Sequence, residues 1–432
     1  MTSTSAMIPA PHGSFGPDDD HGIAAALSAF FEARETPPEL LALGEPTHFE
    51  PAFGYLRNRM LRGLVEHGFS SVALESDRIA ALRVDAFVRG GAGTLDQVIA
   101  EGFSHDFGAL AANRELVAWM RAYNHGRPAG EQLAFHGFDA AMETMSAPSP
   151  RRHLLRLHGY LAEHLGRDAF LHGHADLERL LGDDERWSST EAVLAAEHSP
   201  GASAEALALR GITDDLLTTL HAQVPRLVAA TSLAEWRHAE THGRAALGLL
   251  RYHAQLADPA VPGERLARLC AVRDALMIEN LLDIRARERQ RGRTLVFAHN
   301  LHLQRNPSAM DMGGVDITWS SAGANAAALL GDSYAFIAGS LGASATLGLG
   351  EPPANTYEGA LRRATRDCAL FDGHRLHQAL SATALDVRTD ARPEQGYFPL
   401  DAVMLEHCDA VLHVAAASSR PVDGDAEVAP AS

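Results

Sequence analysis

The sequence predicts an α/β protein, with a central, mainly parallel sheet flanked by helices and a large all-helical insertion. Three observations predict this fold class. Short apolar runs alternate with segments of helical periodicity over residues 23–150, and the same pattern returns over 292–417. Between them, residues 151–291 are rich in Ala, Leu, Arg and Glu and contain almost no β-branched strand candidate. We therefore expect one α/β core, divided in sequence by a helical subdomain that forms a lid over its cleft.

The first half of the core alternates strands with helices. Leu40–Gly44 is a short apolar run ending at a glycine, and apolar residues then recur every three or four positions. Strand followed by helix implies parallel strands with helical crossovers. The expected strands are 40–44, 71–74 and 133–135, and the expected helices are 49–66, 79–88 and 116–123.

The second half repeats this order less regularly. Strands are expected at 294–297, 334–337, 402–405 and 410–412, and a helix at about 357–370. Both ends of the chain are rich in Pro, Ser, Gly, Asp and Ala and lack apolar periodicity. We expect residues 1–22 and 418–432 to be disordered.

Composition excludes several classes of protein. With 37 basic and 55 acidic residues, the formal charge is −18, which repels nucleic acid and anionic membrane surfaces. Cys270, Cys368 and Cys408 are too few and too widely spaced for a disulfide framework or a CxxC metal clip. The first twenty residues lack a basic cluster followed by an apolar stretch, and we expect a cytoplasmic, soluble protein. The sequence gives no oligomeric state.

Polar residues directly after predicted strands are the first candidates for a site, because ligands of open parallel sheets bind beyond the carboxyl ends of the strands. Glu45 and His48 end the first strand, and Glu75 ends the second. His299 and His302 follow the strand that comes after the helical insertion. Each residue alone could equally cap a strand or a helix. Together they predict one cleft lined by carboxylates and imidazoles.

These residue types suit the activation of water. A carboxylate beside a histidine holds its tautomer and stabilises the imidazolium, while the second ring nitrogen takes a proton. No GxSxG nucleophile elbow is present, and no cysteine lies in a predicted strand-to-helix turn beside a histidine. The sequence therefore favours direct attack by water over a covalent acyl-enzyme.

The order and spacing of several motifs resemble the erythromycin esterase family over about residues 38–415. The GExxH turn Gly44–His48 and the HNxH turn His299–His302 are the most specific parts. The sequence departs from the family's usual tryptophan-bearing segment at Ser104–Gly108. The motifs that carry the resemblance are Leu43–His48, Arg57, Val72–Glu75, Gly137–Asp139, Arg273–Asn280 and Ala298–His302.

The resemblance implies hydrolysis of a lactone or other ester of a macrolide or polyketide-like substrate, in a cleft closed by helices. His48 would be the base that deprotonates water, with Glu45 beside it. Preorganised donors are needed as well, because they stabilise the developing oxyanion. The implied catalytic residues are His48, Glu45, Glu75 and His299, and the implied substrate-binding residues are Arg57, Arg273 and His302.

Three alternatives remain open from the sequence. The same carboxylates and imidazoles could hold a divalent ion in a metal-dependent hydrolase. A His/Glu cleft could also serve cyclisation, elimination or acyl transfer in natural-product biosynthesis, and the Arg-rich, Lys-poor composition is typical of GC-rich bacterial genomes. A non-catalytic protein could use the cleft for a small ligand or haem. Neither antibiotic resistance nor biosynthesis is favoured by the residues themselves.

We expect no metal and no cofactor. His238 and His242 are spaced as metal ligands on one helix, but the HExxH order is absent. The glycine-rich segments lack the Lys and Ser/Thr of a phosphate loop. A solvated helical surface is expected for His153, His158, His164, His172 and His174.

Overall fold

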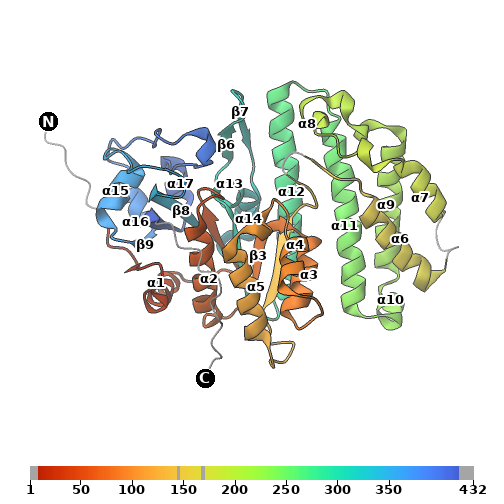
Figure 1. Cartoon of the computed structure of the whole chain (residues 1–432), viewed down its shortest axis with the longest axis horizontal. Coiled ribbons are helices and arrows are strands. Elements are labelled where there is room, and N and C mark those ends of the chain that lie inside the picture. Colours follow the sequence, from red (N-terminus) through yellow and green to blue (C-terminus); the bar gives the residue numbers. More distant parts are fainter. Residues whose placement is uncertain (1–7, 144–145, 167–170, 418–432) are drawn as a thin grey trace. The chain divides into compact units, whose positions relative to one another are not determined.

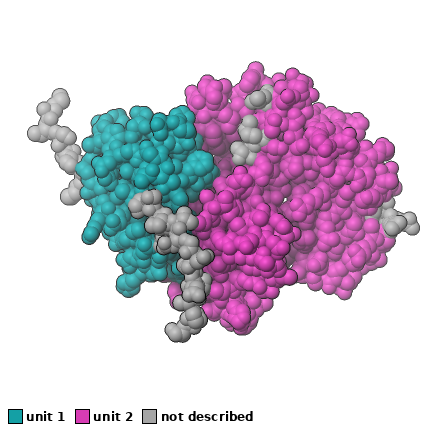
Figure 2. All heavy atoms as spheres, in the orientation of Figure 1, with its two compact units in different colours: residues 1–34, 45–63, 337–432 teal, residues 35–44, 64–336 magenta. Residues whose placement is uncertain are grey.

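The computed structural model describes residues 8–143, 146–166 and 171–417, and Figure 1 shows the course of the chain. Its main sheet has eight strands and is mostly parallel, which confirms the predicted mixed α/β class. The chain divides into two compact units, coloured in Figure 2: unit 1 holds residues 1–34, 45–63 and 337–432, and unit 2 holds 35–44 and 64–336.

Unit 1 contains one end of the sheet, in the order β1-β9-β10-β8. Strand β10 pairs parallel with β8, whereas β9 pairs antiparallel with both β10 and β1. Its elements are β1 (Gly13–Phe15), α1 (Asp20–Glu32), most of α2 (Pro51–Val65), most of β8 (Tyr334–Ser344), α15 (Tyr357–Ala364), β9 (Cys368–Asp372), α16 (Gly373–Leu380), α17 (Ala402–His407) and β10 (Ala410–Ala417).

Unit 2 contains the strands ordered β2-β5-β3-β4, with β3 parallel to both β5 and β4. All four strands are almost entirely buried, as expected where helices cover both faces of a parallel sheet. The elements around this half are β2 (Leu40–Glu45), β3 (Phe69–Asp77), α3 (Ala80–Val88), α4 (Leu95–Glu101), α5 (Ala111–Asn124), β4 (Ala134–Asp139), β5 (Arg293–His299), α13 (Asn300–Leu303), β6 (Ser308–Asp311), β7 (Asp316–Trp319) and α14 (Ala322–Leu330).

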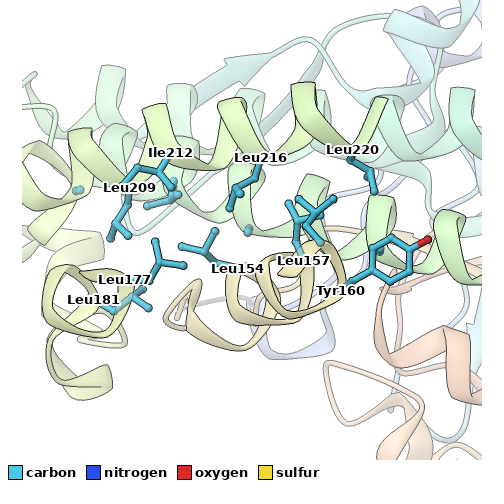
Figure 3. Close-up of a cluster of buried hydrophobic side chains, with 14 of the residues drawn as sticks. Leu154, Leu157, Tyr160, Leu177, Leu181, Leu209, Ile212, Leu216 and Leu220 are labelled. Atoms are coloured by element: carbon cyan, nitrogen blue, oxygen red, sulfur yellow. The ribbon is translucent and has the colours of Figure 1, made fainter. Parts of the chain in front are cut away.

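The segment between β4 and β5 is helical, as the composition predicts. Figure 1 shows α6, α9 and α11 lying side by side, and these helices pack against one another. Leucines at helical spacing, among them Leu154, Leu209 and Leu216, interdigitate in a core of their own (Figure 3). The helices are α6 (Arg151–Leu165), α7 (His174–Leu181), α8 (Glu191–Leu194), α9 (Ala204–Ala222), α10 (Val224–Ala230), α11 (Leu233–Leu256) and α12 (Pro262–Glu288).

The expected disorder of residues 1–22 is wrong where the structure describes this segment. Gly13–Phe15 adds an edge strand to β9, and α1 begins at Asp20. The Asp19 side chain accepts a hydrogen bond from the Gly22 N–H at 2.9 Å, which satisfies an otherwise unbonded donor of the first turn. A pairing of three residues is too short to produce a periodic signal. The predicted tail, 418–432, lies outside the described residues.

Two further element predictions near the C-terminus are wrong. Residues 402–405 begin the helix α17 rather than forming a strand, because the Asp401 carboxylate caps it by accepting from the Met404 N–H at 2.7 Å. The helix expected over 357–370 stops at Ala364, and the chain re-enters the sheet as β9. The first error concerns a short apolar run, for which periodicity does not separate helix from strand. The second concerns the end of a helix, because the apolar residues from Cys368 onward belong to β9.

None of the helices that the structure describes combines the length and apolar character needed to cross a membrane.

Candidate active site

Three strands of unit 2 bring polar residues to one edge of the sheet. Leu74 of β3 lies opposite Gly137 of β4 and Phe297 of β5, and the strands are parallel. The residues that follow these positions therefore emerge at the same edge. They include Glu75, a predicted site residue that is 4% exposed. They also include the polar residues that end β4 and β5, each two positions after the residue that pairs with Leu74.

Those two residues are Asp139 and His299, and Arg273 of α12 reaches into the same group. Arg273 donates to Asp139 through Nε at 3.1 Å and through Nη2 at 2.5 Å, and to Glu75 Oε1 at 3.3 Å. Burial by itself would raise the pKa of Asp139, but Arg273 and His105 hold that pKa well below its usual range. Asp139 is therefore an anion that fixes the guanidinium, and Arg273 is a permanent cation at the strand ends.

His302 lies between two further carboxylates. Its Nδ1 is 2.9 Å from Asp274 Oδ1, and its Nε2 is 3.4 Å from Glu75 Oε1. Although burial disfavours the charged ring, Asp274 and Glu75 raise the pKa of His302 to about 9. Asp274 is itself fixed by Trp319, whose Nε1–H donates to Oδ2 at 2.6 Å. At neutral pH, His302 is thus an imidazolium and cannot act as a base.

His299 is held in one orientation by its backbone neighbours. Its own N–H donates to Glu75 Oε2 at 2.9 Å, and its Nδ1 accepts from the Leu301 N–H at 3.2 Å. Because Nδ1 accepts, the proton of the neutral ring is assigned to Nε2. His299 therefore presents an N–H donor, and Glu75 is occupied as an acceptor of hydrogen bonds.

The opposite tautomer is set at the GExxH turn in unit 1. His48 Nδ1 lies 2.8 Å from Glu45 Oε1, and an ionised carboxylate can only accept. The proton is therefore on Nδ1, and Nε2 carries the lone pair. The His48 side chain is 28% exposed and that of Glu45 is 10% exposed. This is the arrangement required of a histidine general base.

The turn that carries His48 is anchored on both sides. The Thr47 hydroxyl donates to the Gln395 carbonyl at 3.1 Å, and the Phe398 N–H donates to the Pro46 carbonyl at 2.9 Å. Glu50, at the start of α2, accepts from the Ser344 hydroxyl at 2.5 Å. These bonds hold the imidazole on a fixed loop, as positioning for catalysis requires.

Arg57, the third predicted residue in unit 1, lies on α2 and is 2% exposed. Its Nε and Nη2 donate to the Asn58 side-chain oxygen at 3.0 and 2.7 Å. The structure thus pairs Glu45 with His48 in unit 1, where Arg57 also lies, and assembles the other predicted residues in unit 2.

Glycine is required at the start of the GExxH motif for a steric reason. Within unit 2, a Cβ atom on Gly44 would lie 2.0 Å from the side-chain oxygen of Asn300, the second residue of the HNxH motif. A real Cβ atom essentially never approaches an oxygen so closely. The end of β2 and the turn after β5 therefore pack directly against each other, although 255 positions separate them in the sequence.

Sequence reasoning missed several residues of the network. Asp139 and Asp274 lie within the motifs that resemble the family, but the sequence assigns them no role: Asp139 comes four residues after the predicted strand 133–135, whereas Glu75 directly follows the predicted strand 71–74. His105 had no periodic or strand-end signal. The Nε2 atom of His105 lies 2.9 Å from Asp139 Oδ2. His105 and the next residue, Asp106, both have a backbone φ of 57°. Such left-handed backbone in non-glycine residues is strained and clusters at functional sites.

The expectation that the histidines of α6 decorate a solvated surface is wrong for two of them. His153 and His158 are 4% and 6% exposed, because His153 packs against His242 of α11 and His158 contacts the His172 carbonyl at 3.2 Å. Among residues 8–143, 146–166 and 171–417, no group of three or more His, Cys, Asp or Glu side chains is arranged to hold a metal ion.

Comparison with known proteins agrees with the motifs. The family model described as erythromycin esterase matches residues 64–417, which is most of the chain. The chain belongs to the erythromycin esterase family. Membership of this family implies a hydrolytic enzyme. The matched residues include Glu75, Arg273 and the HNxH turn, and they begin after His48.

Solved structures share the fold of this erythromycin esterase family member. A Bacillus cereus protein has 16% identity and a TM-score of 0.67, with 94% of this chain and 95% of that chain covered. A succinoglycan biosynthesis protein has 16% identity and a TM-score of 0.62, covering 88% of each chain. A mutant of the erythromycin esterase EreC in its open conformation has 20% identity and a TM-score of 0.60, covering 89% of this chain and 92% of that chain. No curated protein sequence matches the chain.

The charge of His302 gives a prediction for alkaline pH. Because the folded-state pKa is raised to about 9, the stabilisation from its ion pairs is fully present below the unfolded value of 6.5 and is lost as pH rises through about 9. We expect both hydrolytic rate and thermal stability to fall in that window. In Asp274→Asn the fall should begin about one pH unit lower or more, because one of the two anions that hold the proton is gone.

The measurement is the pH dependence of kcat and Tm between pH 7 and 10.5. Glu279→Gln is the matched control, since Glu279 is an exposed carboxylate on the same helix and pairs with Arg251. An alkaline limit that stays in place in Asp274→Asn would contradict the assignment of this limit to His302.

Proposed function

We propose that the protein hydrolyses a lactone or ester of a macrolide or polyketide-like substrate, with water activated by His48 and without a covalent acyl-enzyme. The observation that carries the proposal is the 2.8 Å contact between His48 Nδ1 and Glu45, which leaves Nε2 as the base. Arg273, His299 and His302, which contact Glu75 at the strand ends, would supply hydrogen-bond donors and positive charge.

The reaction follows from these protonation states. His48 Nε2 takes a proton from water as its oxygen attacks the carbonyl carbon, and Glu45 stabilises the imidazolium that forms. The His299 Nε2–H, the His302 imidazolium and the Arg273 guanidinium are suited to stabilise the oxyanion. When the carbon–oxygen bond breaks, the imidazolium of His48 returns the proton to the leaving alkoxide. Acid and alcohol are then released, and His48 is again neutral.

Two structural relations support placing both motifs in one reaction. Strands β2 and β5 are neighbours in the sheet order, and their last residues are Glu45 and His299. Within unit 2, Gly44 at the end of β2 also lies close to Asn300, which directly follows β5. Both motifs thus begin where adjacent strands end, which is the usual location of ligand sites in α/β sheets.

Direct attack by water is supported by the state of the cysteines. Burial raises the pKa of Cys270 to about 11 and that of Cys368 to about 12. Both are therefore thiols at neutral pH and poor nucleophiles. We also propose that the helical segment 151–291 closes over the substrate as a lid. The similar EreC structure is described as an open conformation, and the proposed lid is consistent with a cycle of opening and closing.

Product labelling tests the reaction type. The protein should be incubated with macrolactones and simple aryl and alkyl esters in ¹⁸O-water, and the products analysed by mass spectrometry. Hydrolysis places one ¹⁸O in the product acid and none in the alcohol. A product without ¹⁸O would instead support cyclisation, elimination or acyl transfer. Full activity after treatment with a chelator would exclude the metal-dependent alternative.

A further inference from the structure

A large cleft lies in unit 2. Its volume is about 1290 Å³, and residues of α3, α6, α11 and α12 line it. Small-molecule sites typically span roughly 300–1,000 Å³. Arg287, which lines this cleft, is about four turns from Arg273 on α12, or about 21 Å along the helix axis. The part of the cleft around Arg287 is thus distant from Arg273.

The charge of this cleft is opposite to that of the chain. Seven arginines and four carboxylates line it, whereas the whole chain has 55 acidic and 37 basic residues. The lining therefore has an excess of positive charge, and such an excess attracts anionic ligands. A basic cleft in a strongly acidic protein is not expected from composition.

Among the described residues, two of the arginines make no direct ion pair, although the charge of Arg152 also acts to lower the pKa of Asp77. Others have a carboxylate partner, as Arg89 has in Asp85 at 3.0 Å. Arg152 of α6 and Arg237 of α11 line the cleft, and in the part of the chain that the structure describes neither has a carboxylate within 4 Å or a side-chain hydrogen bond. Their guanidinium donors are available to a ligand. Planar guanidinium forks match phosphate and carboxylate oxygens.

The histidines beside them favour an anion over a metal cation. His238 and His242 line the cleft, their rings 4.7 Å apart, and His242 Nδ1 is 3.1 Å from His153 Nδ1. The pKa of His242 is lowered to about 3, mainly by burial. Repulsion from neighbouring histidines, Arg152 and Arg156 lowers it further. At neutral pH the positive charges of Arg152 and Arg156 would repel a divalent ion. Neutral imidazole N–H groups can instead donate to an anion.

We propose that this cleft binds a small organic anion carrying phosphate or carboxylate groups, with Arg152 and Arg237 as its principal ligands. The inference rests on the arginines and the cleft, and it is independent of the proposed hydrolysis. Arg152 is exposed and Arg237 is half-buried, so both can be replaced without removing a core contact.

Calorimetric titration of the full chain with inorganic pyrophosphate, and separately with citrate, tests the proposal at low ionic strength. We expect saturable binding of at least one of the two. Pyrophosphate alone would identify a phosphate ligand, and citrate alone a carboxylate ligand. Arg152→Gln and Arg237→Gln should each weaken binding about tenfold or more, since each removes charge-assisted hydrogen bonds. Thermal unfolding checks that the variants remain folded.

Arg226→Gln is the matched control. Arg226 is an exposed arginine of α10 in the same helical segment, bonded to the His164 carbonyl and absent from the cleft lining. It should bind both probes as the unmodified protein does. The proposal is overturned if neither anion binds at millimolar concentration, or if Arg226→Gln weakens binding as much as the cleft variants do.

Discussion

Replacing His48 by Asn should lower kcat by about 10²- to 10⁴-fold, because a general base usually contributes that much and Asn cannot accept the proton at neutral pH. The fold should persist, since the His48 side chain is partly exposed and the turn is held by other residues. Glu45→Gln should reduce kcat less. The glutamine side chain still offers an oxygen acceptor to His48 Nδ1, and only the negative charge of the carboxylate is lost. The measurement is steady-state hydrolysis of the best ester found by product analysis.

His374→Asn is the matched control, since His374 is an exposed histidine of the same unit, at the start of α16. It should leave kcat and KM unchanged. Near-native turnover in His48→Asn would remove His48 from the mechanism, whereas a rise in KM with kcat intact would make it a binding residue.

Arg273→Gln should have the second large effect, on activity and stability together. The substitution leaves Asp139 and Glu75 buried without the cation that they share. Breaking a buried ion pair by removing one partner costs about 3–5 kcal/mol in the free energy of unfolding. Loss of a preorganised donor to the oxyanion lowers kcat by about 10²- to 10³-fold. Urea unfolding and ester hydrolysis measure the two effects.

Arg273→Lys separates charge from geometry. Lysine keeps the cation but not the fork that contacts both Asp139 oxygens, so stability should recover more than kcat does. Arg251→Gln, on the exposed face of α11, serves as the control for loss of an arginine. Unchanged stability in Arg273→Gln would contradict the account of the buried network.

The sequence predicts the parts of this fold in which periodicity is strong. The strand predicted at 40–44 is observed as Leu40–Glu45, and the segment predicted to be helical, 151–291, contains long helices such as α11, because many residues repeat one pattern in each. The short pieces at the sheet edge could not be predicted, because the pairing of Gly13–Phe15 with β9 is made by tertiary contact. Similarly, the apolar run at 402–405 is compatible with a strand or a helix, and the cap by Asp401 stabilises the helix.

The site follows the same division. Strand ends and motifs identify Glu75 and His299, since their position in a parallel sheet is fixed by topology. Charge states are not readable from the sequence. His302 is a cation because Asp274 and Glu75 converge on it, and His105 meets Asp139 through a strained loop. Those contacts depend on packing between segments far apart in the chain.

We propose His48 as the general base, and the pH dependence of kcat/KM between pH 6 and 8 is the sharpest test of that claim. In the unmodified protein, kcat/KM should rise with pH and reach a plateau once the imidazole is neutral. In His48→Asn, the much smaller residual kcat/KM should rise tenfold per pH unit throughout, because hydroxide then replaces the histidine. The same plateau in the variant as in the unmodified protein would contradict the claim.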